Sequence, residues 1–111
     1  MDLQALIDLI RREWHWTERR YPGMSKHGEP GSEARRRFQR RHVLLHLAKQ
    51  VGKLSEFEER NDHGRHSGAH AARTEQIAKM LISVLQFSMV ENITAEELAA
   101  AIKQVFHPAP A

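Results

Sequence analysis

Apolar side chains recur every three or four residues in four segments of the chain, and this spacing is typical of amphipathic α-helices. No segment alternates apolar and polar residues over the length of a strand, so an all-α fold is predicted. The predicted helices span residues 2–20, 32–60, 70–91 and 94–106. A loop at about 21–32, a polar connector at about 61–69 and a frayed tail at 107–111 complete the chain. The sequence therefore predicts one domain, residues 1–111, built as a bundle of about four helices.

The two longest predicted helices each carry an apolar stripe that we expect to form the core. In the second helix this stripe consists of Leu44, Leu45, Leu47, Ala48, Val51, Leu54 and Phe57. In the third helix it consists of Ile77, Met80, Leu81, Val84, Leu85 and Ser88. Such stripes bury themselves against each other when helices pack side by side.

Capping residues mark three of the predicted helix starts. Asp2 and Ser32 each precede a helical segment, and Thr94 with Glu97 three residues later forms a capping box. Trp14 and Trp16 fall inside the first predicted helix, where residues two apart point in different directions. We therefore expect one tryptophan in the core and the other at a subunit interface or against a ligand base.

Two polar stripes run beside the apolar ones. Along the second helix, separations of four, four and three residues connect His42, His46, Gln50 and Lys53. Along the third helix, similar separations connect Gln76, Lys79, Ser83 and Gln86. Facing polar stripes of a helical bundle usually line a cavity where substrates or metals bind. We expect a pocket here, with Lys49 and Glu75 at its border.

Length and composition narrow the classes of protein further. A chain of 111 residues makes one domain with a modest core, so we expect a homo-oligomer, either a dimer or a tetramer. No apolar run approaches the ~18 residues of a membrane span, and the expected location is cytoplasmic. The absence of cysteine excludes disulfides, zinc-thiolate sites and thiol nucleophiles.

The net charge of +3 comes largely from arginine, above all from the run between residues 35 and 41. Two interpretations of this run remain open. We favour the solvated start of a long helix, which predicts no nucleic-acid partner. The alternative is a site for phosphate or nucleic acid, because such clusters neutralise backbone phosphates.

Two motifs on the predicted second and third helices carry a family resemblance. They read Lys49-Gln50-Val51-Gly52-Lys53-Leu54 and Glu75-Gln76-Ile77-Ala78-Lys79-Met80-Leu81. These motifs resemble those of the MazG-like all-α nucleoside triphosphate pyrophosphohydrolases, which read roughly Glu-Glu-x-Gly-Glu-Leu and Glu-x-x-Asp before an apolar run. The resemblance covers about residues 38–106 and includes the stretch at 92–98 that opens the last helix. It implies a MazG-like helical fold.

The resemblance also implies a reaction, and the sequence departs from the family at the residues that perform it. Family members hold Mg²⁺ with carboxylates and split a nucleoside triphosphate into monophosphate and pyrophosphate. The family's acids are replaced here by Gln50, Lys53, Gln76 and Lys79. A neutral amide is a weak ligand for a hard cation, and an ammonium has no lone pair. We therefore expect no bound Mg²⁺ and no other cofactor, and weak or no hydrolysis, with Glu75 as a single surviving acid.

Three roles remain open for Lys53 and Lys79. They can pair with Glu56, Glu58 or Glu75 and be structural. They can take over the charge of the metal and hold a phosphate or nucleotide. They can also serve new chemistry as an amine nucleophile or base. The protein is accordingly either an enzyme derived from the pyrophosphohydrolases or a non-catalytic, redesigned helical scaffold that binds anions.

His42 and His46 stand four residues apart, which is the spacing of a helical two-histidine metal site. Eight histidines in the chain make such a pair probable by chance, so packing and hydrogen bonding is the interpretation we favour.

Overall fold

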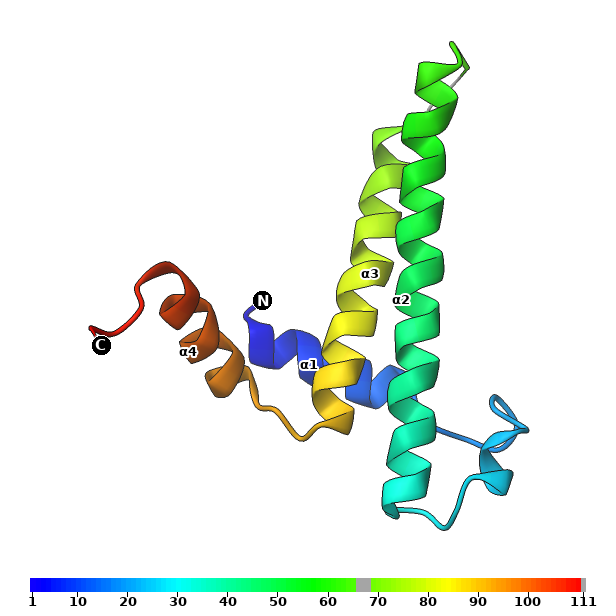
Figure 1. Ribbon diagram of the computed structural model, residues 1–111, viewed down its shortest axis with the longest axis vertical. Coiled ribbons are helices and arrows are strands. Elements are labelled where there is room, and N and C mark those ends of the chain that lie inside the picture. Colours follow the sequence, from blue (N-terminus) through cyan, green and yellow to red (C-terminus); the bar gives the residue numbers. More distant parts are fainter. Residues whose placement is uncertain (66–68, 111) are drawn as a thin grey trace.

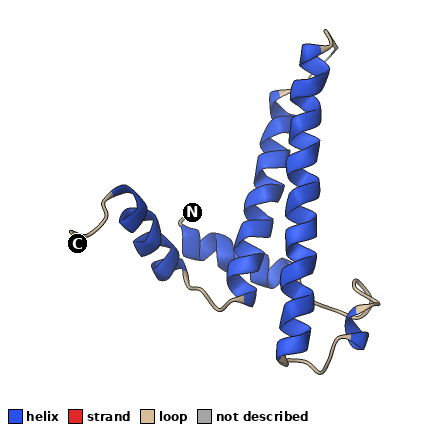
Figure 2. Ribbon diagram, in the orientation of Figure 1, coloured by secondary structure: helices blue, strands red, loops and turns tan. Residues whose placement is uncertain are grey.

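The computed structural model describes residues 1–65 and 69–110, and the regular structure in these ranges is entirely helical (Figures 1 and 2). The elements are α1 (Leu3–Glu13), the short 3-10 helix η1 (Met24–Lys26), α2 (Glu33–Asp62), α3 (His70–Val90) and α4 (Ala95–Phe106). The predicted all-α fold with four helices is therefore confirmed.

A long antiparallel hairpin of α2 and α3 dominates the molecule (Figure 1). The helix α1 crosses the base of this hairpin and contacts both α3 and α4. A small apolar core at this crossing contains Ile7, Ile10 and Leu85. Partly buried side chains that pack around it are Leu3, Leu6, Met89, Ala95 and Leu98. The apolar face of α1 is thus buried as its spacing predicts.

Three helices begin at the predicted caps. The side chains of Asp2 and Ser32 accept hydrogen bonds from the backbone three residues later. Thr94 and Glu97 form the complete capping box. Each such cap satisfies a backbone N–H that has no partner inside its helix.

The first helix is shorter than predicted. The expected range was 2–20, but α1 ends at Glu13 because Trp14 adopts extended backbone angles. Its indole Nε1 donates a hydrogen bond of 3.0 Å to the hydroxyl of Tyr21. In an extended segment, residues two apart lie on the same side, and the ring centroids of Trp14 and Trp16 are 4.7 Å apart. The expectation that the two tryptophans lie in different places, one in the core and one at an interface or ligand, is therefore wrong.

The segment after α1 is fastened to the start of α2 by a buried arginine. Arg35 is 8% exposed, and its Nε and Nη2 donate to the carbonyl oxygen of Gly28 at 3.1 and 2.7 Å. Gly28 has a φ of +85°, and a Cβ atom there would lie 2.7 Å from Oγ of Ser32. Met24 of η1 is buried as well. The predicted loop at 21–32 is thus an ordered segment held to α2 by Arg35, and Arg35 is not part of a solvated arginine run.

The second loop and the tail agree with the prediction where the structure describes them. The helix α2 continues two residues beyond its predicted end, to Asp62, and α3 begins at His70. Residues 66–68 of the predicted connector and Ala111 of the tail lie outside the described residues. Within the described ranges, no helix combines the length and the apolar character needed to cross a bilayer.

The predicted core stripes of α2 and α3 are largely on the surface of the single chain. Leu44, Ile77 and Leu81 are 51%, 56% and 46% exposed. The side chains between the two helices are instead partly polar, because Gln76 and Ser83 are buried there. The radius of gyration of 17.1 Å exceeds the roughly 13 Å of a compact domain of this length. The expectation that the whole of both apolar stripes forms the core is therefore wrong for one copy of the chain, although Leu54, Phe57 and Met80 are half-buried and Leu85 is buried.

Candidate functional site

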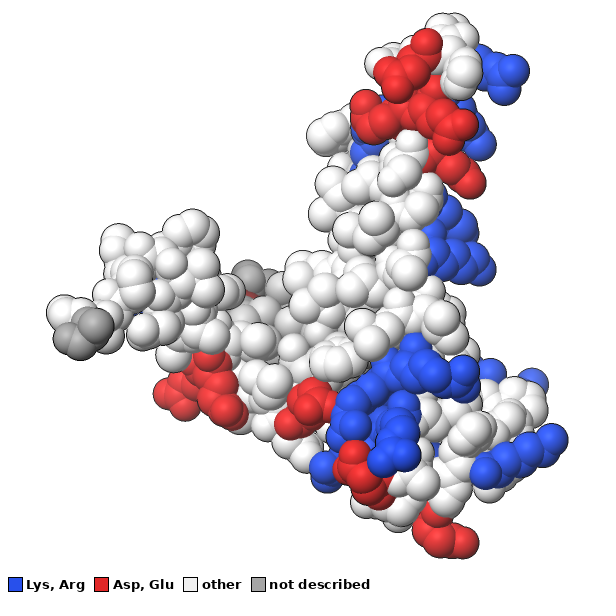
Figure 3. Space-filling view, in the orientation of Figure 1, with Lys and Arg blue, Asp and Glu red and all other residues white. Residues whose placement is uncertain are grey.

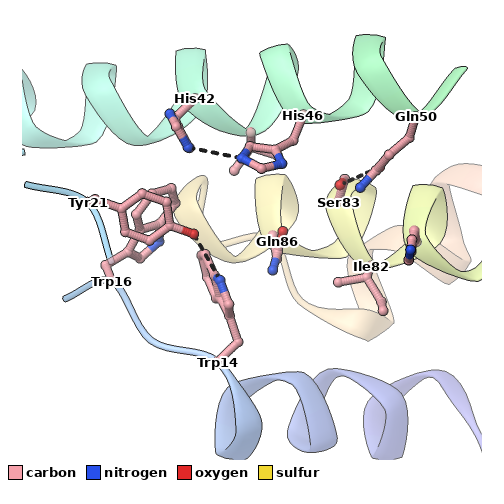
Figure 4. Close-up of a pocket in the computed structure, with 11 residues that line it drawn as sticks. Trp14, Trp16, Tyr21, His42, His46, Gln50, Ile82, Ser83 and Gln86 are labelled. Carbon is pink, nitrogen blue, oxygen red and sulfur yellow. Dashed lines mark hydrogen bonds between the residues drawn. The ribbon is translucent and has the colours of Figure 1, made fainter. Parts of the chain in front are cut away.

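A cavity of about 140 Å³ lies between α2, α3 and the segment that follows α1 (Figure 4). Its walls are formed by Trp14, Trp16, Tyr21, His42, Val43, His46, Gln50, Lys79, Ile82, Ser83 and Gln86. Three regions of the chain that are distant in sequence thus meet at one site.

The two polar stripes predicted from the sequence face each other across the hairpin. Oγ of Ser83 donates a hydrogen bond of 2.8 Å to Oε1 of Gln50. Nε2 of Gln76 donates to the backbone carbonyl of Gln50 at 3.1 Å. These bonds satisfy polar groups that are buried between the helices. They also fix the amide of Gln50 at one end of the cavity (Figure 4).

The structure brings only part of the predicted site together. Six of the predicted residues line the cavity, namely His42, His46, Gln50, Lys79, Ser83 and Gln86. Lys49, Lys53 and Glu75 are exposed, and Gln76 is buried beside the cavity in its bond to Gln50. Lys79 pairs with Glu75 on the same helix at 3.6 Å. Of the two lysines, only Lys79 therefore borders the cavity. Its pairing with Glu75 agrees with a structural role, which was one of the three roles left open for it.

An aromatic wall closes the side of the cavity opposite α2 and α3. The rings of Trp16 and Tyr21 lie 4.6 Å apart, and Tyr21 meets the ring of His42 edge-on at 4.9 Å. The sequence singled out the tryptophans but placed them on a helix. The alternation of Trp14, His15 and Trp16 is the signal of an extended segment that could have located this wall.

A second, larger hollow of about 570 Å³ adjoins the first. Trp14, Tyr21, His42 and His46 line both. The remaining walls are Arg20, Pro22, Gly23 and Phe38, none of which the sequence indicated. The combined site thus extends from the amides between α2 and α3 to a guanidinium in the loop.

The two histidines of α2 contact each other. Their Nε2 atoms are 3.1 Å apart, so one ring must donate a hydrogen and the other must accept it. Burial lowers the pKa of His42 below its ordinary value, and the neighbouring His46 and Arg41 add to this effect. The packing and hydrogen-bonding interpretation of this pair agrees with the geometry.

A loss of stability at mildly acidic pH should follow from the lowered pKa of His42. Between its folded pKa and the ordinary value of 6.5, the unfolded chain binds more protons than the folded chain. The free energy of unfolding must therefore fall as the pH drops through this window. We expect the thermal midpoint to fall less from pH 7.5 to 5.5 in His42→Gln than in the original protein. The exposed His107→Gln serves as the control, and an equal pH dependence in all three proteins would contradict the prediction.

The amide of Gln86 lines the cavity and has no hydrogen-bond partner among the described side chains. This residue is 9% exposed, borders the cavity, and forms no side-chain hydrogen bond within the described residues. Figure 4 shows it on α3 between the aromatic wall and Ser83. Among the described residues no fully buried side-chain nitrogen or oxygen lacks a partner, so the amide of Gln86 is open to the cavity and available to water or a ligand.

The site does not fit the magnesium ion that the family resemblance implies. Among the described residues, no carboxylate lines the cavity, and no three histidine or acidic side chains are grouped closely enough to hold a metal. Gln50 and Gln76 offer neutral amides that are already engaged with each other's helix, and Lys79 is a cation. A hard divalent ion needs anionic oxygen ligands, and these residues do not supply them.

Comparison with known proteins adds no relative. No protein-family model, curated protein or solved structure matches this chain.

Proposed function

We propose that this protein binds a nucleotide in the pocket without hydrolysing it through Mg²⁺. The observation that carries the proposal is the composition of one continuous wall. It combines closely packed aromatic rings, an amide without a side-chain hydrogen bond that is open to the cavity, and a lysine, and it contains no carboxylate among the described residues. Each of these groups matches one part of a nucleotide.

The nucleobase fits the inner cavity. Aromatic side chains stack on the flat faces of bases, and Trp16 and Tyr21 present such surfaces. The amide of Gln86 has both donors and an acceptor for the edge of a base. The inner cavity of about 140 Å³ is smaller than the ~300–1,000 Å³ of ordinary ligand pockets. The sugar and phosphates would therefore occupy the adjoining hollow.

Two cations stand where the phosphates would lie. Lys79 borders the inner cavity and Arg20 borders the outer hollow. The ion pair of Lys79 with Glu75 is exposed, with the two side chains 48% and 69% accessible. Exposed pairs of this kind contribute little, so the ammonium can exchange its partner for a phosphate. This agrees with the phosphate-binding role that the sequence left open for Lys79.

The resemblance to pyrophosphohydrolases supports the same ligand class and a loss of the reaction. Amides and lysines at the acid positions give a pocket that attracts phosphate and disfavours Mg²⁺. The proposal includes self-association into a homo-oligomer, because the exposed apolar residues of α2 and α3 need a cover.

The binding experiment is a calorimetric titration with ribo- and deoxyribonucleoside triphosphates, in low salt with chelator. We expect binding by the original protein and an affinity about 5- to 150-fold weaker in Trp16→Ala and in Gln86→Leu, since base stacking and the hydrogen bonds of one amide are each worth about 1–3 kcal/mol. Phe106→Ala and Gln104→Leu on α4 are matched controls, because both side chains are exposed outside the pocket.

Two results would contradict the proposal. Absence of heat with every nucleotide would show that the pocket does not bind these nucleotides. Release of pyrophosphate that depends on Mg²⁺ or Mn²⁺ would show that a metal site assembles despite the missing acids.

A further inference from the structure

One side of α2 carries an exposed stripe whose two ends have opposite charge and lie at equal distances from its middle. Successive separations of three or four residues place its members on one face of the helix. The stripe consists of Arg37, Arg41, Leu44, Ala48, Val51, Ser55, Glu59 and Asp62, all of them exposed. We call it the α2 stripe. It begins with two cations, ends with two anions and has small and apolar residues in between.

The α2 stripe is complementary to its own reverse. Four pairs lie symmetrically, to within one residue, about the peptide bond between residues 49 and 50. These pairs are Arg37 with Asp62, Arg41 with Glu59, Leu44 with Ser55, and Ala48 with Val51. A two-fold axis through that point would place each residue opposite its counterpart in an antiparallel copy. Such self-complementarity is the requirement of an isologous dimer.

The four charged residues of the α2 stripe have no ion-pair partner in the described part of the chain. Their neighbours on α2 do: Arg40 pairs with Glu33 and Glu91, and Glu58 pairs with Arg73. Figure 3 shows most of the acidic side chains of the hairpin at its free end, beside a few basic ones, and a larger basic cluster at its base. The charges of the stripe are thus available to a partner.

The neighbouring surface of α3 is apolar and equally uncovered. Ile77, Leu81 and Val84 are 56%, 46% and 44% exposed, and Leu44 and Val51 on α2 are 51% and 44% exposed. Contiguous apolar surface of this kind marks an interaction site in soluble proteins. The hydrogen bond between Ser83 and Gln50 lies inside the hairpin. It does not remove the exposed apolar side chains of α2 and α3 from water, so a partner that covers them would add stability.

We propose that a second copy of this chain packs against the α2–α3 hairpin, with the two α2 helices antiparallel and crossing near residues 49 and 50. The basic end of each α2 stripe then meets the acidic end of the other, and the apolar residues of both hairpins are covered between them. A parallel arrangement would place arginine against arginine and acid against acid, which charge repulsion opposes. The proposal fixes the face and the direction of association, and it does not depend on a ligand.

Paired charge reversals test the interface, with sedimentation equilibrium as the measurement. We expect the original protein to be dimeric. Arg37→Glu with Arg41→Glu, and separately Glu59→Arg with Asp62→Arg, should each raise the dissociation constant at least about 100-fold, since like charges then meet at both ends. An equimolar mixture of the two variants should form a one-to-one dimer. All four residues are exposed, so the variants should keep the helical circular dichroism of the original protein.

Two further variants test the direction of the helices. The chain that carries all four reversals should dimerise again, because unlike charges then face each other in the antiparallel pair. In a parallel pair, like charges face each other in every one of these variants, so neither the pairs of reversals nor all four together would change the dissociation constant appreciably. The protein contains no cysteine, so any disulfide that forms must involve the introduced cysteine. A mixture of Leu44→Cys and Ser55→Cys chains should form a mixed disulfide dimer on oxidation. Leu44→Cys alone should not, because the two copies of that residue lie about 11 residues apart along the antiparallel helices, or roughly 16 Å, which is too far for a disulfide.

The matched control reverses two cations on another side of α2. Lys49→Glu with Lys53→Glu changes the charge as Arg37→Glu with Arg41→Glu does, but these lysines lie off the α2 stripe. The control should leave the dimer intact. A monomeric original protein would overturn the proposal. A dimer that withstands either pair of stripe reversals, or a disulfide formed by Leu44→Cys alone, would also overturn it.

Discussion

Replacing Arg35 by alanine is expected to lower the free energy of unfolding by about 3 kcal/mol, because two hydrogen bonds from a charged donor are lost inside the protein. The side chain is 8% exposed, and its guanidinium donates twice to the carbonyl oxygen of Gly28. Its ion pair with Glu18 at 3.9 Å is long and adds little. Urea unfolding followed by tryptophan fluorescence would measure the loss.

The same replacement should weaken nucleotide binding, although Arg35 does not line the pocket. Its bond to Gly28 holds the segment that carries Trp16 and Tyr21 against α2. Without that bond the aromatic wall must be ordered when the ligand binds, and this ordering costs affinity. Arg35→Lys keeps the charge but not the two-nitrogen geometry, so it should be intermediate in both measurements.

The adjacent arginine supplies the control. Arg36 is half-exposed and pairs with Glu33 at 3.8 Å, so Arg36→Ala should change the unfolding free energy by less than about 1 kcal/mol. If Arg35→Ala unfolds at the same urea concentration as Arg36→Ala, the hydrogen bonds of Arg35 to Gly28 do not stabilise the segment after α1.

Restoring the family's acids should produce a protein that binds Mg²⁺ and releases pyrophosphate from nucleoside triphosphates. The variant combines Gln50→Glu, Lys53→Glu, Gln76→Glu and Lys79→Asp. Gln50 bonds to both Gln76 and Ser83, so residue 79, which lies between these two, is level with residue 50. The hairpin is antiparallel, so residue 53, one turn after residue 50, lies level with residue 76. The new carboxylates would therefore face each other, and carboxylate oxygens are the ligands that Mg²⁺ needs.

The restored variant should be less stable than the original protein without metal and should regain stability with it. Gln76 is 6% exposed, and a glutamate there would lose the bond to the carbonyl of Gln50 and bury an uncompensated charge. Mg²⁺ at one hundred times its dissociation constant would add about 2.7 kcal/mol to the free energy of unfolding. Thermal unfolding with chelator and with Mg²⁺ measures this difference.

A control for the restored variant adds acids elsewhere. Lys103→Glu with Gln104→Glu on α4 changes the charge at exposed positions outside the pocket and should create no response to Mg²⁺. A restored variant that folds and shows no Mg²⁺ binding by calorimetry would show that these four positions are not a former metal site.

The sequence by itself determined the helices, because the interactions that start and support a helix join residues three or four positions apart. The caps at Asp2, Ser32 and Thr94 lie where the pattern predicts. It also determined that two polar stripes run along α2 and α3, and most of their members line the pocket. Both properties follow from helical periodicity alone.

The tertiary structure decided what the periodicity left open. The contact of Trp14 with Tyr21 ends α1 early and builds the aromatic wall, and the bond of Arg35 to Gly28 places that wall on α2. It also decided that the hairpin turns its polar stripes inward and leaves apolar side chains such as Leu44 and Ile77 on the surface. A helix with both an apolar and a polar stripe has two sides suited to packing, and only its contacts with other helices determine which side is covered.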